Sequence, residues 1–262
     1  MNTLREDLST ELMDLINTAA RMISSTENGV VLTGAGISTA SGIPDFRTPG
    51  SGLWSRYNPM EVASLTAFRY HPEKFFAWLH PMAKKMFEAL PNPAHYALAV
   101  LEKAGDIRTT ITQNIDGLHQ RAGSKQVLEV HGSMESLTCI GCYQKYPARQ
   151  FISTFIEQEI PPRCPQCSCF LKPDIILYEE QLPKTTWLKA QNACRNCRLI
   201  LVAGSSLEVT PAATLPQRAL ENNANLIIIN QGRTYLDSRA AVRIEGDLAE
   251  IMPLIAKAVL DE

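Results

Sequence analysis

Five short runs, most of them largely apolar and each followed at once by small or polar residues, constrain the fold of this chain most. They are residues 30–33, 107–112, 127–130, 199–203 and 226–229. Segments with apolar residues at helical spacing lie among them, so that strands alternate with helices. Continuous apolar strands are typical of a parallel sheet that is covered by helices on both faces. We therefore predict an α/β fold.

The residues that end these five strands predict a shared site. Parallel sheets bind their ligands beyond the carboxyl ends of the strands. In chain order, the runs are followed by Gly34, Gln113, His131, Gly204 and Asn230. Small, amide and imidazole side chains at one edge indicate a single polar site there.

Other segments favour helices that serve packing. The first 25 residues carry apolar residues at helical spacing and predict an amphipathic helix. Further helices are expected at 75–90 and 94–103, from 211 onward, and after 247. The connection 41–54 is long and polar, which is common in loops that cover a ligand.

Seven cysteines, an odd number, argue against a disulfide framework. Cys139 and Cys142 form one Cys-x-x-Cys pair, Cys164 and Cys167 a second, with 21 residues between the pairs. Two such pairs predict a structural zinc site with four thiolate ligands. Cys169 is an alternative fourth ligand to Cys167. A rival pairing of Cys194 with Cys197 lies in a helical context, where buried free thiols are favoured.

The charge balance excludes some classes of partner. The chain has 25 Lys and Arg against 27 Asp and Glu, and no run of basic residues. We therefore expect no direct nucleic-acid binding. The apolar runs are far shorter than the roughly 20 residues of a membrane-spanning helix, and the acidic start does not resemble a targeting peptide. We expect a cytoplasmic protein that is monomeric and does not bind membranes.

The turn after the first strand, Gly34-Ala35-Gly36, is suited to phosphate binding. Glycines let backbone amides approach a phosphate at the start of a helix. The full dinucleotide fingerprint is incomplete, because Thr39 stands where the third glycine would be. Arg47 in the following loop could pair with a pyrophosphate, and a surface ion pair is the alternative.

His131 is the candidate general base. An imidazole titrates near neutral pH and suits proton removal from a hydroxyl. A hydrogen-bonded structural histidine is the alternative, but Asn114 and Asp116 follow a neighbouring strand and could orient a polar ligand. No catalytic role is assigned to the other histidines, which are His71, His80, His95 and His119.

Taken together, these motifs resemble those of the sirtuins. They are GAGISTASGIPDFR at 34–47, TQNIDGLHQRAG at 112–123, the His131-Gly132 pair, the two Cys-x-x-Cys pairs, GSSLEVTPAA at 204–213 and Asn230. The resemblance runs from about Met13 to the C-terminus. It implies NAD-dependent removal of acetyl or other apolar acyl groups from lysine side chains of proteins, giving nicotinamide and O-acyl-ADP-ribose. NAD would be the co-substrate, and one zinc would be structural.

The resemblance also implies a domain division. Residues 1–133 and 172–262 would form a Rossmann-like NAD-binding domain. Residues 134–171 would form a smaller zinc-binding module, completed by helices near 48–90. The NAD cleft and the acyl-lysine tunnel would lie between them.

Roles for individual residues follow from the same resemblance. His131 and Asn114 would be catalytic, with His131 taking a proton from a ribose hydroxyl. The implied NAD contacts are Gly34, Ala35, Gly36, Ile43, Asp45, Phe46, Arg47, Gln113, Asn114, Ile115, Asp116, Gly204, Ser205, Ser206, Asn230 and Leu248. The substrate peptide would pair with a strand that holds Ile175, Ile176, Leu177, Tyr178 and Glu179.

Two positions depart from patterns found in the family. Glu179 stands where many sirtuins have glycine, which predicts a preference for basic residues beside the acyl-lysine. Leu79 and Met82 stand where members that prefer acidic acyl groups have Tyr and Arg. A buried carboxylate would have no partner there, so acetyl or longer aliphatic groups are expected. The alternative is that both residues belong only to the core.

Two other functions compete with deacylation. One is protein mono-ADP-ribosyl transfer, which uses the same cleavage of NAD. The other is a non-catalytic NAD-sensing zinc adaptor, which would not need the polar residues at the strand ends. The presence of His131 favours deacylation.

Overall fold

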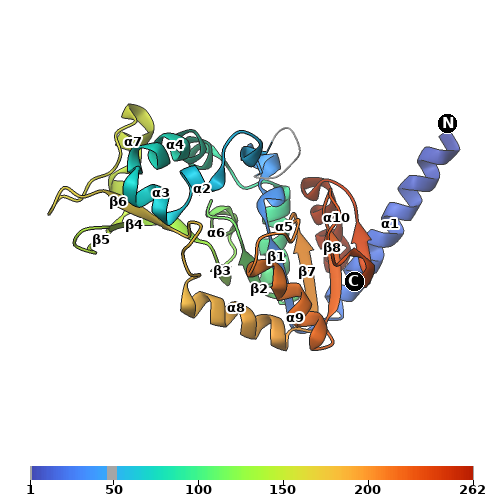
Figure 1. Cartoon of the computed structure of the whole chain (residues 1–262). Coiled ribbons are helices and arrows are strands. Elements are labelled where there is room, and N and C mark those ends of the chain that lie inside the picture. The colour runs from blue at the N-terminus through green and yellow to red at the C-terminus, as the bar shows by residue number, and fades with distance from the viewer. Residues whose placement is uncertain (1, 46–51, 262) are drawn as a thin grey trace.

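The computed structural model describes residues 2–45 and 52–261. Over these residues the chain forms a six-stranded sheet of order β3-β2-β1-β7-β8-β9 and a three-stranded sheet of order β5-β4-β6. Figure 1 shows the large sheet with its helices toward one end of the molecule and the small sheet toward the other. The predicted Phe46 and Arg47 contacts lie outside the described residues.

All strand pairs of the large sheet are parallel. Its strands are β1 (Gly29–Thr33), β2 (Ile107–Thr112), β3 (Val127–Glu129), β7 (Leu199–Ala203), β8 (Asn225–Ile229) and β9 (Val242–Ile244). The strand order runs outward from β1 in one direction and from β7 in the other, which is the doubly wound arrangement of Rossmann-like folds. The predicted fold class is confirmed. Within this sheet, the short edge strand β9 is the one that the sequence did not predict.

Helices cover both faces of this sheet. Val31 faces the side packed by α1 (Asn2–Ser24), α5 (Pro93–Ala104) and α10 (Leu248–Leu260). Val30 and Leu32 face the opposite side, packed by α8 (Lys184–Asn196) and α9 (Leu215–Glu221). Alternate residues of a strand point to opposite faces, so a strand buried on both must be apolar throughout. The helix expected from 211 begins with a 3-10 turn, Ala212–Thr214.

The small sheet is antiparallel and consists of β4 (Gly132–Cys139), β5 (Lys145–Pro147) and β6 (Leu171–Ile175). Beside it lie α2 (Pro59–Val62), α3 (Leu65–Tyr70), α4 (Pro72–Glu88) and α7 (Ile152–Gln158). Phe68, Phe75 and Phe76 form an aromatic core between these helices. The short helix α6 (Leu118–Ala122) connects β2 to β3.

The chain crosses from the large sheet to the small sheet at His131. β3 ends at Glu129 and β4 begins at Gly132, where φ is +78°. A Cβ atom on Gly132 would overlap the carbonyl oxygen of Asp174 on β6. Glycine is therefore required at this crossing, and His131 is held between the two sheets. None of the helices in the described part of the chain is long and apolar enough to cross a bilayer.

Candidate active site

Two cavities, of about 600 Å³ and about 360 Å³, lie at the carboxyl edge of the large sheet. Among the residues that line them, Ala35, Gln113, Asn114 and His131 belong to both linings. These residues come from the loops after β1, β2 and β3. The polar site predicted from the strand ends is therefore where the two cavities meet.

The smaller cavity follows the loops after β1, β7 and β8. Of the predicted NAD contacts, its lining includes Gly34, Ala35, Gly36, Asp45, Gln113, Asn114, Gly204, Ser205, Ser206, Asn230 and Leu248. The predicted contacts Ile43, Ile115 and Asp116 line the larger cavity instead. Glycine, serine and amide side chains leave room and hydrogen-bonding groups for a nucleotide, so this cavity fits NAD.

The glycines of the turn after β1 are needed for a close contact between two loops. The Gly36 N–H donates to the Gly204 carbonyl oxygen at 2.9 Å, and the Gly34 N–H donates to the Ala203 oxygen at 3.2 Å. A Cβ atom on Gly34 would lie 2.7 Å from the Gly204 oxygen. The sequence predicted that these amides would face a phosphate. Instead, the Gly34 and Gly36 amides donate hydrogen bonds to backbone oxygens of the protein itself. These bonds hold the turns after β1 and β7 together at the cavity.

The hydrogen bond of His131 sets its tautomer. Its Nδ1 lies 2.9 Å from the carbonyl oxygen of Gln113, which can only accept, so Nδ1 carries the proton. In the neutral ring the lone pair is then on Nε2. A general base needs this arrangement. The side chain of Gln113 donates in turn to Ser205 Oγ at 2.8 Å, which ties the β2 and β7 loops together.

Asn114 is held by three hydrogen bonds. Its Nδ2 donates to the Gly34 oxygen at 3.0 Å and to Ser38 Oγ at 3.2 Å, and its backbone N–H donates to Thr112 Oγ1 at 3.0 Å. Both Nδ2 contacts lie within the protein, so the side-chain oxygen is the group that can address a ligand.

Asp116 completes this part of the site. Ser38 Oγ donates to its Oδ2 at 2.7 Å, and the Leu118 N–H donates to Oδ1 at 2.9 Å. Burial raises the pKa of Asp116 above its ordinary value. Sequence reasoning missed Ser38 as a site residue. The pattern that could have identified Ser38 is a hydroxyl side chain in the turn that follows the first predicted strand.

The larger cavity has an apolar region on α4. Trp78, Met82 and Met86 line it from successive turns of that helix, and Trp54 stacks on Trp78 with ring centres 5.7 Å apart. The described lining includes the predicted Met82 but not Leu79, which is 1% exposed in the aromatic core. Leu79 is three residues from Met82 and so lies on the same side of the helix, but neighbouring core residues enclose it and it does not reach the cavity. The sequence missed Trp54, Trp78 and Met86.

The predicted peptide-binding segment also lines the larger cavity. Its residues there are Ile175, Ile176, Leu177, Tyr178 and Glu179. β6 ends at Ile175. Beyond it, the Ile176 N–H donates to the His131 oxygen at 2.8 Å and the Tyr178 N–H donates to the Ala63 oxygen at 3.0 Å. The segment thus already pairs within the protein on one side, and its pairing with a peptide stays a prediction.

Glu179 has a backbone conformation that favours glycine. Its φ is +74°, in the left-handed region that a side chain with a Cβ atom seldom adopts. The Thr66 N–H, in the first turn of α3, donates to its carboxylate at 2.8 Å. Hydrogen bonds from Thr66 lower the pKa of this exposed carboxyl group. Glu179 therefore brings a negative charge to the rim of the larger cavity while it binds the start of α3.

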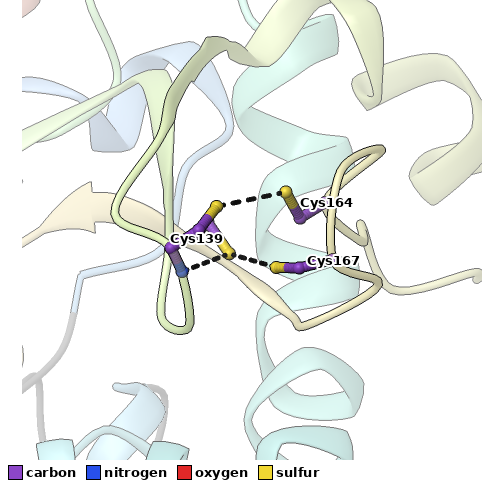
Figure 2. Close-up of side chains that lie close together, drawn as sticks. Cys139, Cys164 and Cys167 are labelled. Atoms are coloured by element: carbon purple, nitrogen blue, oxygen red, sulfur yellow. Dashed lines mark hydrogen bonds between the residues drawn. The ribbon is translucent and has the colours of Figure 1, made fainter.

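Four thiols converge beside the small sheet. The Sγ atoms of Cys139, Cys142, Cys164 and Cys167 all lie within 4.8 Å of one another. Cys139 Sγ lies 3.4 Å from Cys167 Sγ, as Figure 2 shows, and Cys142 Sγ lies 3.6 Å from Cys164 Sγ. The Gly141 and Cys142 amides donate to Cys139 Sγ at 3.3 and 3.4 Å. Four sulfur ligands at this spacing fit a tetrahedral zinc ion.

Among the alternatives for the metal site, the structure groups Cys167, and not Cys169, with the other three thiols. Cys169 lies close by, with Gly141 packed against it, but it is not part of the four-thiol group found among the described residues. Cys194 and Cys197 are buried against the large sheet. Burial raises the pKa of Cys197 to about 11 and that of Cys194 further, so both are neutral thiols.

Comparison with known proteins supports one family. Residues 34–211 match the Sir2 family. The NAD-dependent protein deacylase 2 of Archaeoglobus fulgidus is 45% identical over 94% of this chain and 96% of its own length. A solved Sir2 enzyme superimposes with a TM-score of 0.89 at 44% identity, covering 95% of this chain and 98% of that one. Another, bound to a myristoylated histone peptide, has a TM-score of 0.82 at 39% identity over 95% and 98%. This chain belongs to the Sir2 family.

Proposed function

We propose that this protein removes acetyl and other apolar acyl groups from lysine side chains of proteins in an NAD-dependent reaction. The observation that carries the proposal is the shared lining of the two cavities. Gln113, Asn114 and His131 stand between a polar cavity that fits NAD and an apolar one that fits an acyl-lysine. A deacylase must bring these two substrates together at one point.

The smaller cavity would hold NAD. Ser205, Ser206 and Asn230 offer hydroxyl and amide groups to its phosphates and riboses, as the family resemblance implies. Ile115 and Asp116 line the larger cavity near Asn114 and would hold the nicotinamide amide. When bound, NAD supplies a ribose carbon that becomes electrophilic as nicotinamide leaves. Contacts from Phe46 and Arg47 are proposed from the resemblance alone.

His131 would act as the general base. Its Nδ1–H donates to the Gln113 oxygen, which places the lone pair on Nε2 at the junction of the cavities. Nε2 would take the proton of a ribose hydroxyl and so make that oxygen nucleophilic. Asn114, with Nδ2 bonded to Gly34 and Ser38, would orient polar atoms of the substrates through its oxygen.

The acyl group would enter the apolar region on α4. The α4 residues that line it are Trp78, Met82 and Met86, none of which carries a charge. A carboxylate brought against them would lose its hydration without gaining a partner. Acetyl and longer aliphatic groups are therefore favoured over acidic ones. The zinc would hold the small sheet in shape and take no part in the reaction.

Incubation with NAD and acyl-lysine peptides tests this function. We expect nicotinamide release that depends on the peptide, with transfer of the acyl group to ADP-ribose detected by mass spectrometry. The His131→Ala variant should lose at least about a hundredfold in turnover while it still binds NAD. His71→Ala, at an exposed histidine outside both cavities, is the control and should keep full activity.

Other outcomes would contradict the proposal. Nicotinamide release without peptide, with label appearing on protein, would indicate ADP-ribosyl transfer. NAD binding without any release would indicate an NAD-sensing adaptor. Full turnover by His131→Ala would reject its role as base. The cytoplasmic location and the monomeric state expected from the sequence stay predictions, for which cell fractionation and sedimentation are the tests.

A further inference from the structure

Several buried polar atoms without a hydrogen-bond partner form a polar layer on neighbouring elements beside the large sheet. Among the described residues these atoms are His95 Nε2, Glu102 Oε2, Thr110 Oγ1, His119 Nδ1 and Ser124 Oγ. They belong to α5, β2, α6 and the turn after α6. Buried polar groups in native proteins are nearly always paired, and where no protein group serves, an internal water does so. Within this layer the unpaired atoms of His95 and His119, whose rings are in contact, point to a bound water.

The two histidines of this layer are in contact and carry complementary tautomers. The Asn92 N–H donates to His95 Nδ1 at 3.3 Å, so the proton of His95 is on Nε2. His119 Nε2 lies 2.9 Å from Thr33 Oγ1, whose own proton goes to Thr112 Oγ1 at 2.8 Å, so His119 Nε2 donates and its Nδ1 keeps the lone pair. One ring thus offers an unpaired donor and the other an unpaired acceptor.

The surroundings keep both rings neutral. His95 is 0% exposed and His119 is 1% exposed, and their ring centres are 5.0 Å apart. Burial lowers the pKa of His95 to about 4, and burial together with His95 lowers the pKa of His119 to about 3. A water between the rings could accept from His95 Nε2–H and donate to His119 Nδ1, which satisfies both atoms at once.

Hydrogen bonds lead from this pair to the site. On one side the chain runs from His119 through Thr33 to Thr112 Oγ1, which accepts the backbone N–H of Asn114 at 3.0 Å. On the other side Asn92, which binds His95, donates from Nδ2 to the Ile37 oxygen at 2.7 Å and to Ser41 Oγ at 3.0 Å. The two ends therefore hold Asn114 and the turn that contains Ser38.

We propose that a buried water joins His95 to His119, and that the resulting relay positions Asn114 and the 37–41 turn for the reaction. His95 and His119 are then positioning residues, since neither belongs to the described lining of the two cavities. The kinetic part of this inference rests on the proposed deacylase function. The proposed water and the two histidine tautomers do not depend on that function.

Three threonine variants test the relay. Thr33→Val removes the hydroxyl that links His119 to Thr112 and should lower kcat about tenfold, because Thr112 Oγ1 loses the hydrogen bond that orients it toward the Asn114 N–H, while the peptide KM changes by less than about twofold. Thr33→Ser keeps a hydroxyl and should restore kcat. Thr110→Val is the matched control and should keep the wild-type kcat. Thr110 is fully buried on the same strand as Thr112, but its hydroxyl lies outside the hydrogen bonds that run from His119 to Asn114.

Two results would overturn the claim that the relay positions Asn114 for the reaction. One is a folded Thr33→Val variant with wild-type kcat. The other is an equal loss of kcat in Thr110→Val, which would reflect disturbed packing. If the wild-type protein releases no nicotinamide, the proposed function fails by itself. The variants are then compared by calorimetric NAD affinity, where Thr33→Val should bind more weakly than Thr33→Ser, and equal affinities would reject positioning.

The wild-type protein supplies a second test that needs no variant. ¹⁵N NMR of the imidazoles should show both His95 and His119 protonated on Nε2 at neutral pH, and a crystal structure at high resolution should show a water between the rings. A proton on Nδ1 of either ring, or a direct ring-to-ring hydrogen bond in place of the water, would overturn the relay.

Discussion

At the scale of single residues, glycine at 132 decides where the candidate base lies. The position combines a φ of +78° with a backbone contact to Asp174 that leaves no room for a Cβ atom. Both conditions arise because the chain turns from the large sheet into the small one immediately after His131. Glycine therefore follows His131 in the sequence because the backbone turn between the two sheets leaves no room for a side chain.

The Gly132→Ala substitution should destabilise the protein by about 2–5 kcal/mol, from the left-handed backbone and the overlap with Asp174 together. Gly42→Ala is the control, because Gly42 has a φ of +85° but open space where its Cβ atom would stand, with no described atom within 4 Å. It should cost only about 1–2 kcal/mol. Urea unfolding measures both. Equal losses would show that the contact with Asp174 does not matter.

The buried histidines predict acid sensitivity. The pKa values of His95 and His119 are about 4 and about 3 in the folded protein, below the ordinary 6.5. As pH falls below 6.5, these two histidines bind protons in the unfolded chain but not in the folded chain. Their contribution to the unfolding free energy is therefore fully present above pH 6.5 and is lost toward pH 4. Each histidine contributes a slope of about 1.4 kcal/mol per pH unit.

His119→Gln removes one of these titrating groups. Its unfolding free energy should fall less between about pH 7 and about pH 4.5 than that of the wild type, even if the variant is less stable at neutral pH. Urea unfolding at the two pH values gives this difference directly. An unchanged pH dependence would show that His119 titrates normally in the folded protein.

At the scale of elements, the apolar residues of α4 have two duties, packing into the core and lining the larger cavity. Trp78, Met82 and Met86 belong to the same core cluster as Leu79 and also line the cavity, which Leu79 does not. Leu79 and Met82 are three residues apart and lie on the same side of the helix, so the packing of other elements decides which of them reaches the cavity. The sequence could show that both Leu79 and Met82 were apolar but not which one faced the cavity.

Two alanine variants separate these duties. Leu79→Ala should cost about 2–5 kcal/mol of stability and leave the preference among acyl groups unchanged. Met82→Ala should widen the cavity and raise the turnover of long aliphatic acyl groups relative to acetyl. A panel of acyl-lysine peptides of graded length measures this ratio. The same ratio in Met82→Ala as in the wild type would exclude Met82 from the acyl pocket.

At the scale of the whole molecule, the site depends on two sheets that meet at His131. The large sheet supplies the polar loops, and the segment after β6 supplies a wall of the larger cavity. The small sheet has only three strands in the described part of the chain, and Cys139 lies in one of them. A bound metal is therefore expected to stabilise this part of the molecule, since a small sheet has little core of its own.

Cys167→Ser and Cys169→Ser test which thiol binds zinc. Cys167→Ser should weaken zinc binding by more than about a hundredfold, beyond the loss seen for a group that only contacts a ligand, and should lower the thermal stability. Cys169→Ser should keep about one zinc per chain, because its thiol is outside the four-sulfur group. Atomic absorption and thermal unfolding are the measurements. Loss of zinc in Cys169→Ser instead would reassign the fourth ligand.

Much of the fold could be predicted from the sequence, because the relevant signals are local. β2 and β7 have the bounds predicted for them. For β7, an apolar run that ends at a glycine marks a buried strand and its end. β9 was missed because a strand as short as Val242–Ile244 carries too little pattern. Residues at strand ends could also be grouped into one site, because parallel strands end at one edge.

The sequence by itself determined the parallel sheet, the polar strand ends and the two cysteine pairs, because periodicity and spacing along the chain carry that information. Only the tertiary structure decided that Cys167 rather than Cys169 joins the thiol group, that Gly34 and Gly36 serve a contact with Gly204, and that His131 lines both cavities. These depend on which distant segments pack together and how closely, and contacts between segments far apart in the chain leave no periodic signal in it.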